Sequence, residues 1–67
     1  MDYPMWHAVE TFNDRSVAMR AKEVLSVSGY KSSVKKYRST NGFDIWHLFT
    51  QGRVDEARQI LMAWRLI

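Results

Sequence analysis

The chain of 67 residues contains no cysteine, one proline and three glycines. Without cysteine, disulfide bonds and thiolate zinc sites are excluded. Its two histidines, His7 and His47, are far apart and have no spaced set of metal ligands around them. We therefore expect no metal and no cofactor. Domains this small usually depend on a disulfide, a metal or a partner chain, and only a partner chain is compatible with this composition.

Long apolar runs are also missing. No stretch approaches the ~20 residues of a membrane-spanning helix, and residues 1–4 lack the basic start and apolar run of a secretory signal. We therefore expect a cytoplasmic protein that does not enter a membrane. A hydrophobic content of 46%, with three residues each of Trp, Tyr and Phe, favours a packed globule over disorder. The length predicts a single domain over residues 1–67.

Acidic residues are absent between Glu23 and Asp44, although the whole chain has a net charge of only +3. The same interval contains four basic residues, Lys31, Lys35, Lys36 and Arg38. This distribution predicts a local positive patch on a nearly balanced molecule.

Catalytic motifs are not found either. The sequence has no cysteine nucleophile, no glycine-rich phosphate loop and no Gly-x-Ser-x-Gly element. His47 is close in sequence to Asp44 and Ser39, but a β-hairpin has no pocket that would exclude water. We expect no catalytic residue and no enzymatic activity.

Three segments have the aromatic and β-branched composition of strands, namely residues 5–12, 31–38 and 43–50. A helix is predicted between the first two, capped by Asn13 or Asp14 and ended by Gly29. Its apolar stripe consists of Val17, Ala21, Val24, Leu25 and Ser28. The predicted fold class is a single α+β domain of order β-α-β-β-α, half of a ferredoxin-like fold, with two helices on one face of a three-stranded sheet.

A second helix is predicted after Gly52. Asp55 and Glu56 fall in its first turn and Arg65 in its last, as the helix dipole favours. Its apolar stripe consists of Val54, Ala57, Ile60, Leu61 and Trp64.

Asn41-Gly42 is a strong hairpin signal, because both residues tolerate positive φ in a two-residue turn. In that register Tyr37 opposes Trp46 and Lys35 opposes Leu48, and a four-residue loop would leave the faces unchanged. One face then consists of Val34, Lys36, Arg38, Phe43, Ile45, His47 and Phe49. The other consists of Lys35, Tyr37, Asp44, Trp46, Leu48 and Thr50. In the first strand, Trp6, Ala8 and Phe12 share one face.

Two helices cover only one face of such a sheet, because the right-handed β-α-β crossover and the following helix pack on the same side. We expect them to cover Val34, Ile45 and Phe49. The predicted interface on the open face consists of Lys35, Tyr37, Trp46 and Leu48. A regulatory module that forms a homodimer or docks on another protein, as an inhibitor or modulator, is the favoured interpretation. Alternatively, Tyr37 and Trp46 form a cross-strand pair that closes a small core.

A second functional hypothesis is a small basic nucleic-acid-binding protein. Sheet-surface readers stack bases on strand aromatics, here Tyr37 and Trp46, and hold phosphates with neighbouring cations. The candidate cations are Lys31, Lys35, Lys36 and Arg38. Charges on an edge strand also discourage strand addition, which is the alternative explanation.

Several segments resemble a family of prokaryotic signal-transducing proteins whose fold is similar to that of the PII regulators. The segments are Asn13 to Ala18, Val24-Leu25, Ser28-Gly29-Tyr30 and Val54 to Leu61. The resemblance implies a signalling role but no particular site residues. A weaker similarity, through Thr11-Phe12 and Phe49, is to the sporulation-related repeat, which binds peptidoglycan glycans across its sheet.

Overall fold

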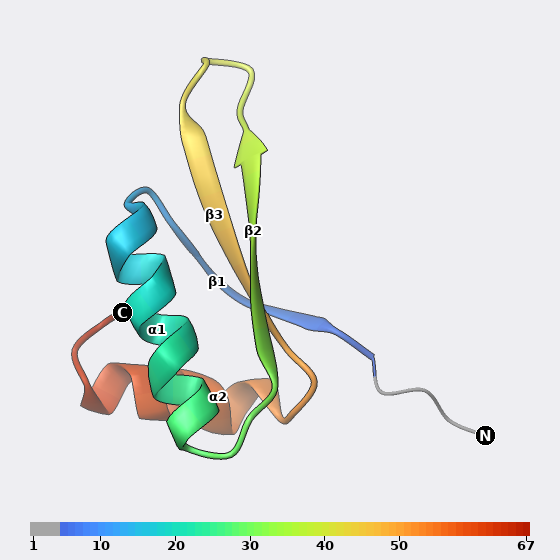
Figure 1. Ribbon diagram of the computed structural model, residues 1–67, viewed down its shortest axis with the longest axis vertical. Coiled ribbons are helices and arrows are strands. Elements are labelled where there is room, and N and C mark those ends of the chain that lie inside the picture. The colour runs from blue at the N-terminus through green and yellow to red at the C-terminus, as the bar shows by residue number, and fades with distance from the viewer. Residues whose placement is uncertain (1–4) are drawn as a thin grey trace.

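The computed structural model describes residues 5–67. Its elements are β1 (His7–Phe12), α1 (Arg15–Val27), β2 (Ser32–Arg38), β3 (Asp44–Thr50) and α2 (Val54–Ala63). The strands form one antiparallel sheet of order β1-β3-β2, and both helices lie on one side of it (Figure 1). The predicted α+β order is confirmed. Pro4, taken as the limit of the first predicted strand, lies outside the described residues.

Helix α1 begins at Arg15 and is capped by Asp14, the second of the two predicted caps. The Asp14 carboxylate accepts hydrogen bonds from the Ser16 amide (2.9 Å) and the Ser16 hydroxyl (2.8 Å). At the other end Gly29 has a φ of 95°, and the Tyr30 amide donates to the Leu25 carbonyl (2.9 Å). The buried side of the helix consists of Ala18, Ala21, Val24 and Leu25, and Val17 packs against the same core. The predicted stripe is therefore correct apart from Ser28, which is exposed.

Helix α2 starts as expected, with Asp55 and Glu56 in its first turn, but it ends earlier than its apolar stripe predicted. Arg65 follows the helix with a φ of 59°, and the Leu66 amide donates to the Leu61 carbonyl (2.9 Å). This chain reversal brings Leu66 against the core and leaves Trp64 65% exposed. The placements of Trp64 in the core stripe and of Arg65 in the last turn were therefore wrong.

The turn between β2 and β3 differs from the predicted one. The Gly42 amide donates to the Ser39 carbonyl (3.0 Å), and the Ser39 amide donates to the Phe43 carbonyl (2.8 Å). Gly42 has a φ of 83°, whereas Asn41 is not among the positive-φ residues. The loop is thus a three-residue one, residues 40–42, with glycine in the left-handed position. It places Tyr37 opposite Ile45 and Lys35 opposite His47.

This one-residue shift turns β3 over relative to the prediction, because side chains alternate between the two faces of a strand. Leu48 is fully buried under the helices, and Trp46 packs against the same core. The prediction that Trp46 and Leu48 lie on the open face was therefore wrong. The expectation that the helices cover Ile45 and Phe49 was wrong for the same reason. The placement of Val34 beside the core was correct.

Strand β1 contains a bulge that divides its predicted face. Ala8 pairs with Phe49, and the register then shifts so that Glu10 pairs with Leu48. Because of this extra residue, Val9 and Phe12 are both buried in the core, while Ala8 lies on the opposite face from Phe12.

The core lies between the helices and one face of the sheet. Its buried hydrophobic residues are Val9, Phe12, Ala18, Ala21, Val24, Leu25, Leu48, Ala57 and Leu61. Thr50 is the buried polar residue at its end, and its hydroxyl donates to the Lys31 carbonyl (2.9 Å) and accepts from the Gly52 amide (3.2 Å). Its hydrogen-bonding groups are therefore satisfied.

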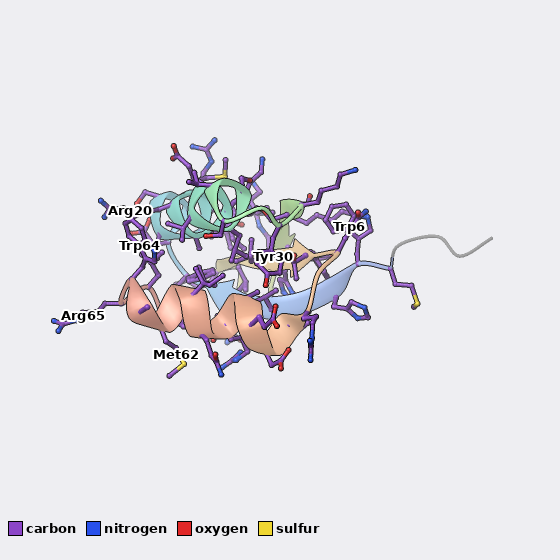
Figure 2. The ribbon with its side chains drawn as sticks, turned by 90° about the horizontal axis from the view of Figure 1, so that it is seen from below. Trp6, Arg20, Tyr30, Met62, Trp64 and Arg65 are labelled. Carbon is purple, nitrogen blue, oxygen red and sulfur yellow. The ribbon has the colours of Figure 1, made fainter. Side chains whose placement is uncertain are left out.

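Tyr30 connects the end of α1 to α2 (Figure 2). Its hydroxyl donates to Glu56 Oε2 (2.6 Å), and this hydrogen bond raises the pKa of Tyr30. The ring lies against Gly52, where a Cβ atom would overlap two ring carbons. Glycine at position 52 is therefore required by the close approach of Tyr30.

We expect Gly52→Ala to lower the free energy of unfolding by about 1–3 kcal/mol, because the Tyr30 ring must move away from the new methyl group. Urea denaturation measures the loss, with Gln51→Ala as the control. In a Tyr30→Ala background the same substitution should cost much less. An equal loss in both backgrounds would rule out the ring overlap as the cause.

Acid should weaken the cap of α1. Hydrogen bonds from the Ser16 hydroxyl, first, and from the Ser16 amide hold the pKa of Asp14 below its usual 3.8. The folded state therefore binds this proton less readily than the unfolded state, and the stabilisation present above about pH 4 is lost as the pH falls through the lowered pKa. Urea midpoints between about pH 5 and about pH 2 should drop less steeply for Asp14→Asn, which keeps an acceptor but does not titrate.

Candidate binding surface

The sheet face opposite the helices is the candidate site, and we call it the open sheet face. Its members are every second residue of the strands, apart from the bulge in β1, together with Trp6, which precedes β1. They are Trp6, Ala8, Thr11, Ser33, Lys35, Tyr37, Ile45, His47 and Phe49. Both helices of the described chain lie on the other side of the sheet (Figure 1). The side chains of this face are therefore accessible to a partner.

Aromatic rings form a row along β3 on this face. The centroids of the Tyr37 and His47 rings are 4.6 Å apart in an edge-on arrangement, at 66° between planes. His47 and Phe49 are stacked at 18°, with centroids 6.2 Å apart. The row follows from the alternation of residues 45, 47 and 49 and from the register that places Tyr37 beside them.

A hollow of about 210 Å³ lies at one end of this row, lined by Trp6, Ser33, Lys35 and Phe49. The two cross-strand neighbours of Phe49 are the small residues Ala8 and Ser33. Because these neighbours are small, the partly exposed Phe49 ring lines the hollow together with Lys35, and a flat group can enter it from solvent.

The open sheet face has a positive character. None of its described members is acidic. The carboxylates of β1 and β3, Glu10 and Asp44, lie on the other face of the sheet, and each is paired with an arginine. Glu10 Oε2 is 3.4 Å from Arg58 Nη1, on α2, and Asp44 Oδ1 is 3.5 Å from Arg38 Nε.

The four predicted basic residues are divided between the two faces of β2. Lys35 lies on the open sheet face, and the alternation places Lys31 on the same side, whereas Lys36 and Arg38 lie on the helix side. All four are exposed. The predicted interface is divided in the same way, since Lys35 and Tyr37 are on the open sheet face but Trp46 and Leu48 are not.

The fold separates His47 from Asp44, the acidic residue close to it in sequence. His47 and Asp44 lie on opposite faces of β3, so they do not act together. Residues 5–67 contain no cluster of three or more potential metal-ligating side chains. Neither described helix has the length and apolar character needed to cross a membrane.

Sequence reasoning missed Trp6, Ile45, His47 and Phe49 as members of the exposed face. The sequence did contain a signal for the correct register. That register pairs the apolar residues Val34 and Leu48, and it pairs the oppositely charged residues Arg38 and Asp44. Such cross-strand matches stabilise a sheet, and they favour the three-residue loop over the two-residue turn.

No family model matches the chain, and no curated protein or solved structure matches it. The resemblances seen in the sequence thus remain expectations, and the open sheet face is interpreted from its own geometry.

Two neighbouring residues of β3 test the assignment of faces. We expect Leu48→Ala to cost about 2–5 kcal/mol of stability, because it leaves a cavity in the core. His47→Ala should cost less than about 1.5 kcal/mol, because it removes only ring contacts on the open sheet face. Chemical denaturation of both variants measures the two losses. A larger loss for His47→Ala than for Leu48→Ala would mean that His47 lies in the core and Leu48 on the open face, as the sequence had predicted.

Proposed function

We propose that this protein is a non-catalytic binding module and that the open sheet face is its binding surface. The observation that supports this is the row of Tyr37, His47 and Phe49, with Trp6 beside it, on a face that no described helix covers. Aromatic residues are enriched at the centres of interfaces, and monomers rarely expose large apolar patches without a function.

Burial of these rings provides a driving force for binding. Tyr37 and Trp6 are each 47% exposed, and removal of apolar surface from water contributes about 25 cal/mol per Å². Lys35 adds a charged group at the edge of the hollow, so that a partner is selected by charge as well as by apolar contact.

The absence of a carboxylate among the described members of the open sheet face supports a binding role over an enzymatic one. His47 is held between two aromatic rings, and no acidic group among residues 5–67 lies on this face to orient it as a general base. A regulatory role in the cytoplasm, as the resemblance to signal-transducing proteins implies, belongs to this proposal. Its two forms are a homodimer and docking on a different molecule.

A second apolar patch on the helix side is the alternative surface. It is lined by Val24, Val27 and Trp64, together with Arg20 and Glu23, and Figure 2 shows Trp64 beside Arg20. We call it the helix-end patch. Its charged residues have both signs, so the positive open sheet face has the clearer preference for one kind of partner.

A hydrophobic fluorescent dye can distinguish the two surfaces. We expect the dye to bind the folded wild-type protein, and Tyr37→Ser combined with Phe49→Ser to lower the dye affinity at least about fivefold. Trp64→Ser, the matched control, should leave the affinity unchanged. Loss of dye binding only in the Trp64 variant would assign the binding surface to the helix-end patch. Light scattering over a concentration series then tests the homodimer, which a constant mass of one chain excludes.

A further inference from the structure

We infer that the partner of the open sheet face is a single-stranded nucleic acid, whose bases stack on the aromatic rings and whose phosphates follow β2. The inference rests on the proposed function, since it assigns a chemical class to the partner of the same face. Two observations carry it: the distribution of cations around β2, and the hollow beside Phe49.

The salt bridges of the described residues leave one group of cations without a carboxylate partner. The salt bridges of the described residues use the cations Arg38, Arg53 and Arg58. None of them involves Lys31, Lys35 or Lys36, which are all exposed at or within β2. The lysines of this edge strand thus have no carboxylate partner in these salt bridges, whereas the carboxylates of β1 and α2 lie next to Arg58 and Arg53.

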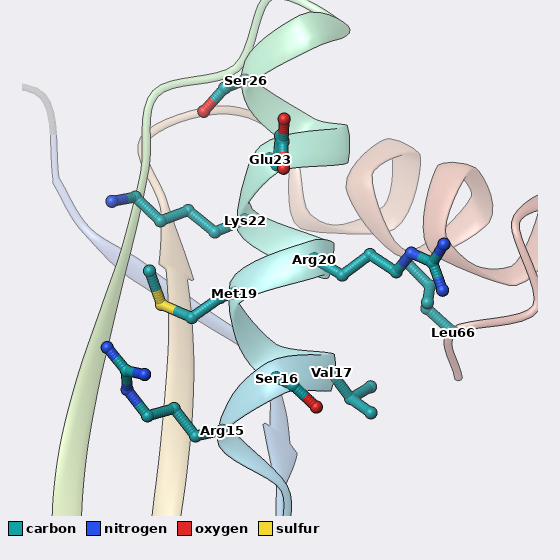
Figure 3. Close-up of a pocket in the computed structure, with 9 residues that line it drawn as sticks. All are labelled: Arg15, Ser16, Val17, Met19, Arg20, Lys22, Glu23, Ser26 and Leu66. Carbon is teal, nitrogen blue, oxygen red and sulfur yellow. The ribbon is translucent and has the colours of Figure 1, made fainter.

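Helix α1 adds more positive charge next to the same strand. Arg15, Met19, Lys22 and Ser26 share one side of the helix. This side faces β2, because the Ser26 hydroxyl lies 3.4 Å from the Ser32 hydroxyl, and the Ser32 hydroxyl donates to the Lys22 carbonyl (3.1 Å). In Figure 3 the side chains of Arg15 and Lys22 extend toward β2.

Lysines from both faces of β2 and the cations of α1 therefore form one band of positive charge along the edge of the sheet. A flexible chain of phosphates fits such a band, because each phosphate contact releases condensed counterions. The band also disfavours a second copy of this protein at the same edge, since the two rows of lysines would repel each other.

The aromatic rings beside this band supply sites for bases. The hollow lined by Trp6, Ser33, Lys35 and Phe49 is open to solvent on a face whose described members include no carboxylate, and the exposed ring of Tyr37 lies farther along the same sheet. Stacking requires unpaired bases. The rings therefore select a single strand over a duplex, in which the base faces are already stacked.

Binding of fluorescein-labelled oligothymidine and oligouridine, followed by anisotropy over a salt series, tests this inference. We expect measurable binding at low salt that weakens steeply as salt is added. Tyr37→Ala and Phe49→Ala should each weaken binding roughly 5- to 150-fold without changing the salt dependence. Lys35→Gln and Lys31→Gln should each reduce the slope of log K against log salt by about 0.7.

Controls separate specific contacts from general charge and from misfolding. Trp64→Ala removes an exposed aromatic ring outside the open sheet face and should leave the affinity unchanged, and a duplex of the same length should bind more weakly than the single strand. Thermal denaturation verifies that each variant is folded. If Phe49→Ala unfolds, Tyr37→Ala alone still tests stacking, because its ring is 47% exposed.

Three results would overturn the inference. They are no binding of either oligonucleotide at low salt, tighter binding of the duplex, and affinities that the Tyr37 and Phe49 variants leave unchanged. If oligonucleotides do not bind but the open-face variants abolish dye binding, only the nucleic-acid inference fails and the proposed binding surface stands. If the same variants leave dye binding intact as well, the proposed function fails with it.

Discussion

The register of β2 against β3 is the constraint on which both the core and the candidate site depend. Gly42, in the left-handed region, closes a three-residue loop, and the loop fixes Val34 opposite Leu48 and Lys36 opposite Trp46. Because side chains alternate along a strand, this one turn places Leu48 in the core and His47 on the open sheet face. A loop shorter by one residue would exchange the two faces of β3.

The fold leaves one surface of the sheet without a cover, and this surface differs from the rest of the molecule. The helix side contains the buried core, whereas the open sheet face contains the partly exposed rings of Tyr37, His47 and Phe49 together with Lys35. The bulge in β1 contributes to this separation, because it keeps both Val9 and Phe12 in the core while Ala8 remains next to Phe49. The packed core and the proposed binding surface thus lie on opposite sides of a single layer.

Charge is organised by the same architecture. Arg58 reaches from α2 to the Val9 carbonyl (2.8 Å) and to Glu10 at the β1 edge, so cations and anions are balanced there. At the β2 edge α1 presents Arg15 and Lys22 beside lysines of the strand. A nearly balanced sequence therefore folds into a molecule with one positive edge, and this asymmetry distinguishes the proposed partner from a second copy of the chain.

The sequence by itself determined the element order, a cap at Asn13 or Asp14, the stop at Gly29 and most of the buried stripe of α1, because these depend on contacts between residues close in the chain. It also showed that Lys35 and Tyr37 lie on one face of their strand. Only the tertiary structure decided which face of β3 accompanies them, where β1 bulges, and that Leu66 rather than Trp64 reaches the core. The face of β3 depends on the length of a turn, for which the sequence allows two or three residues. The bulge and the end of α2 depend on packing between segments that are distant in the chain, which a local pattern of residues does not determine.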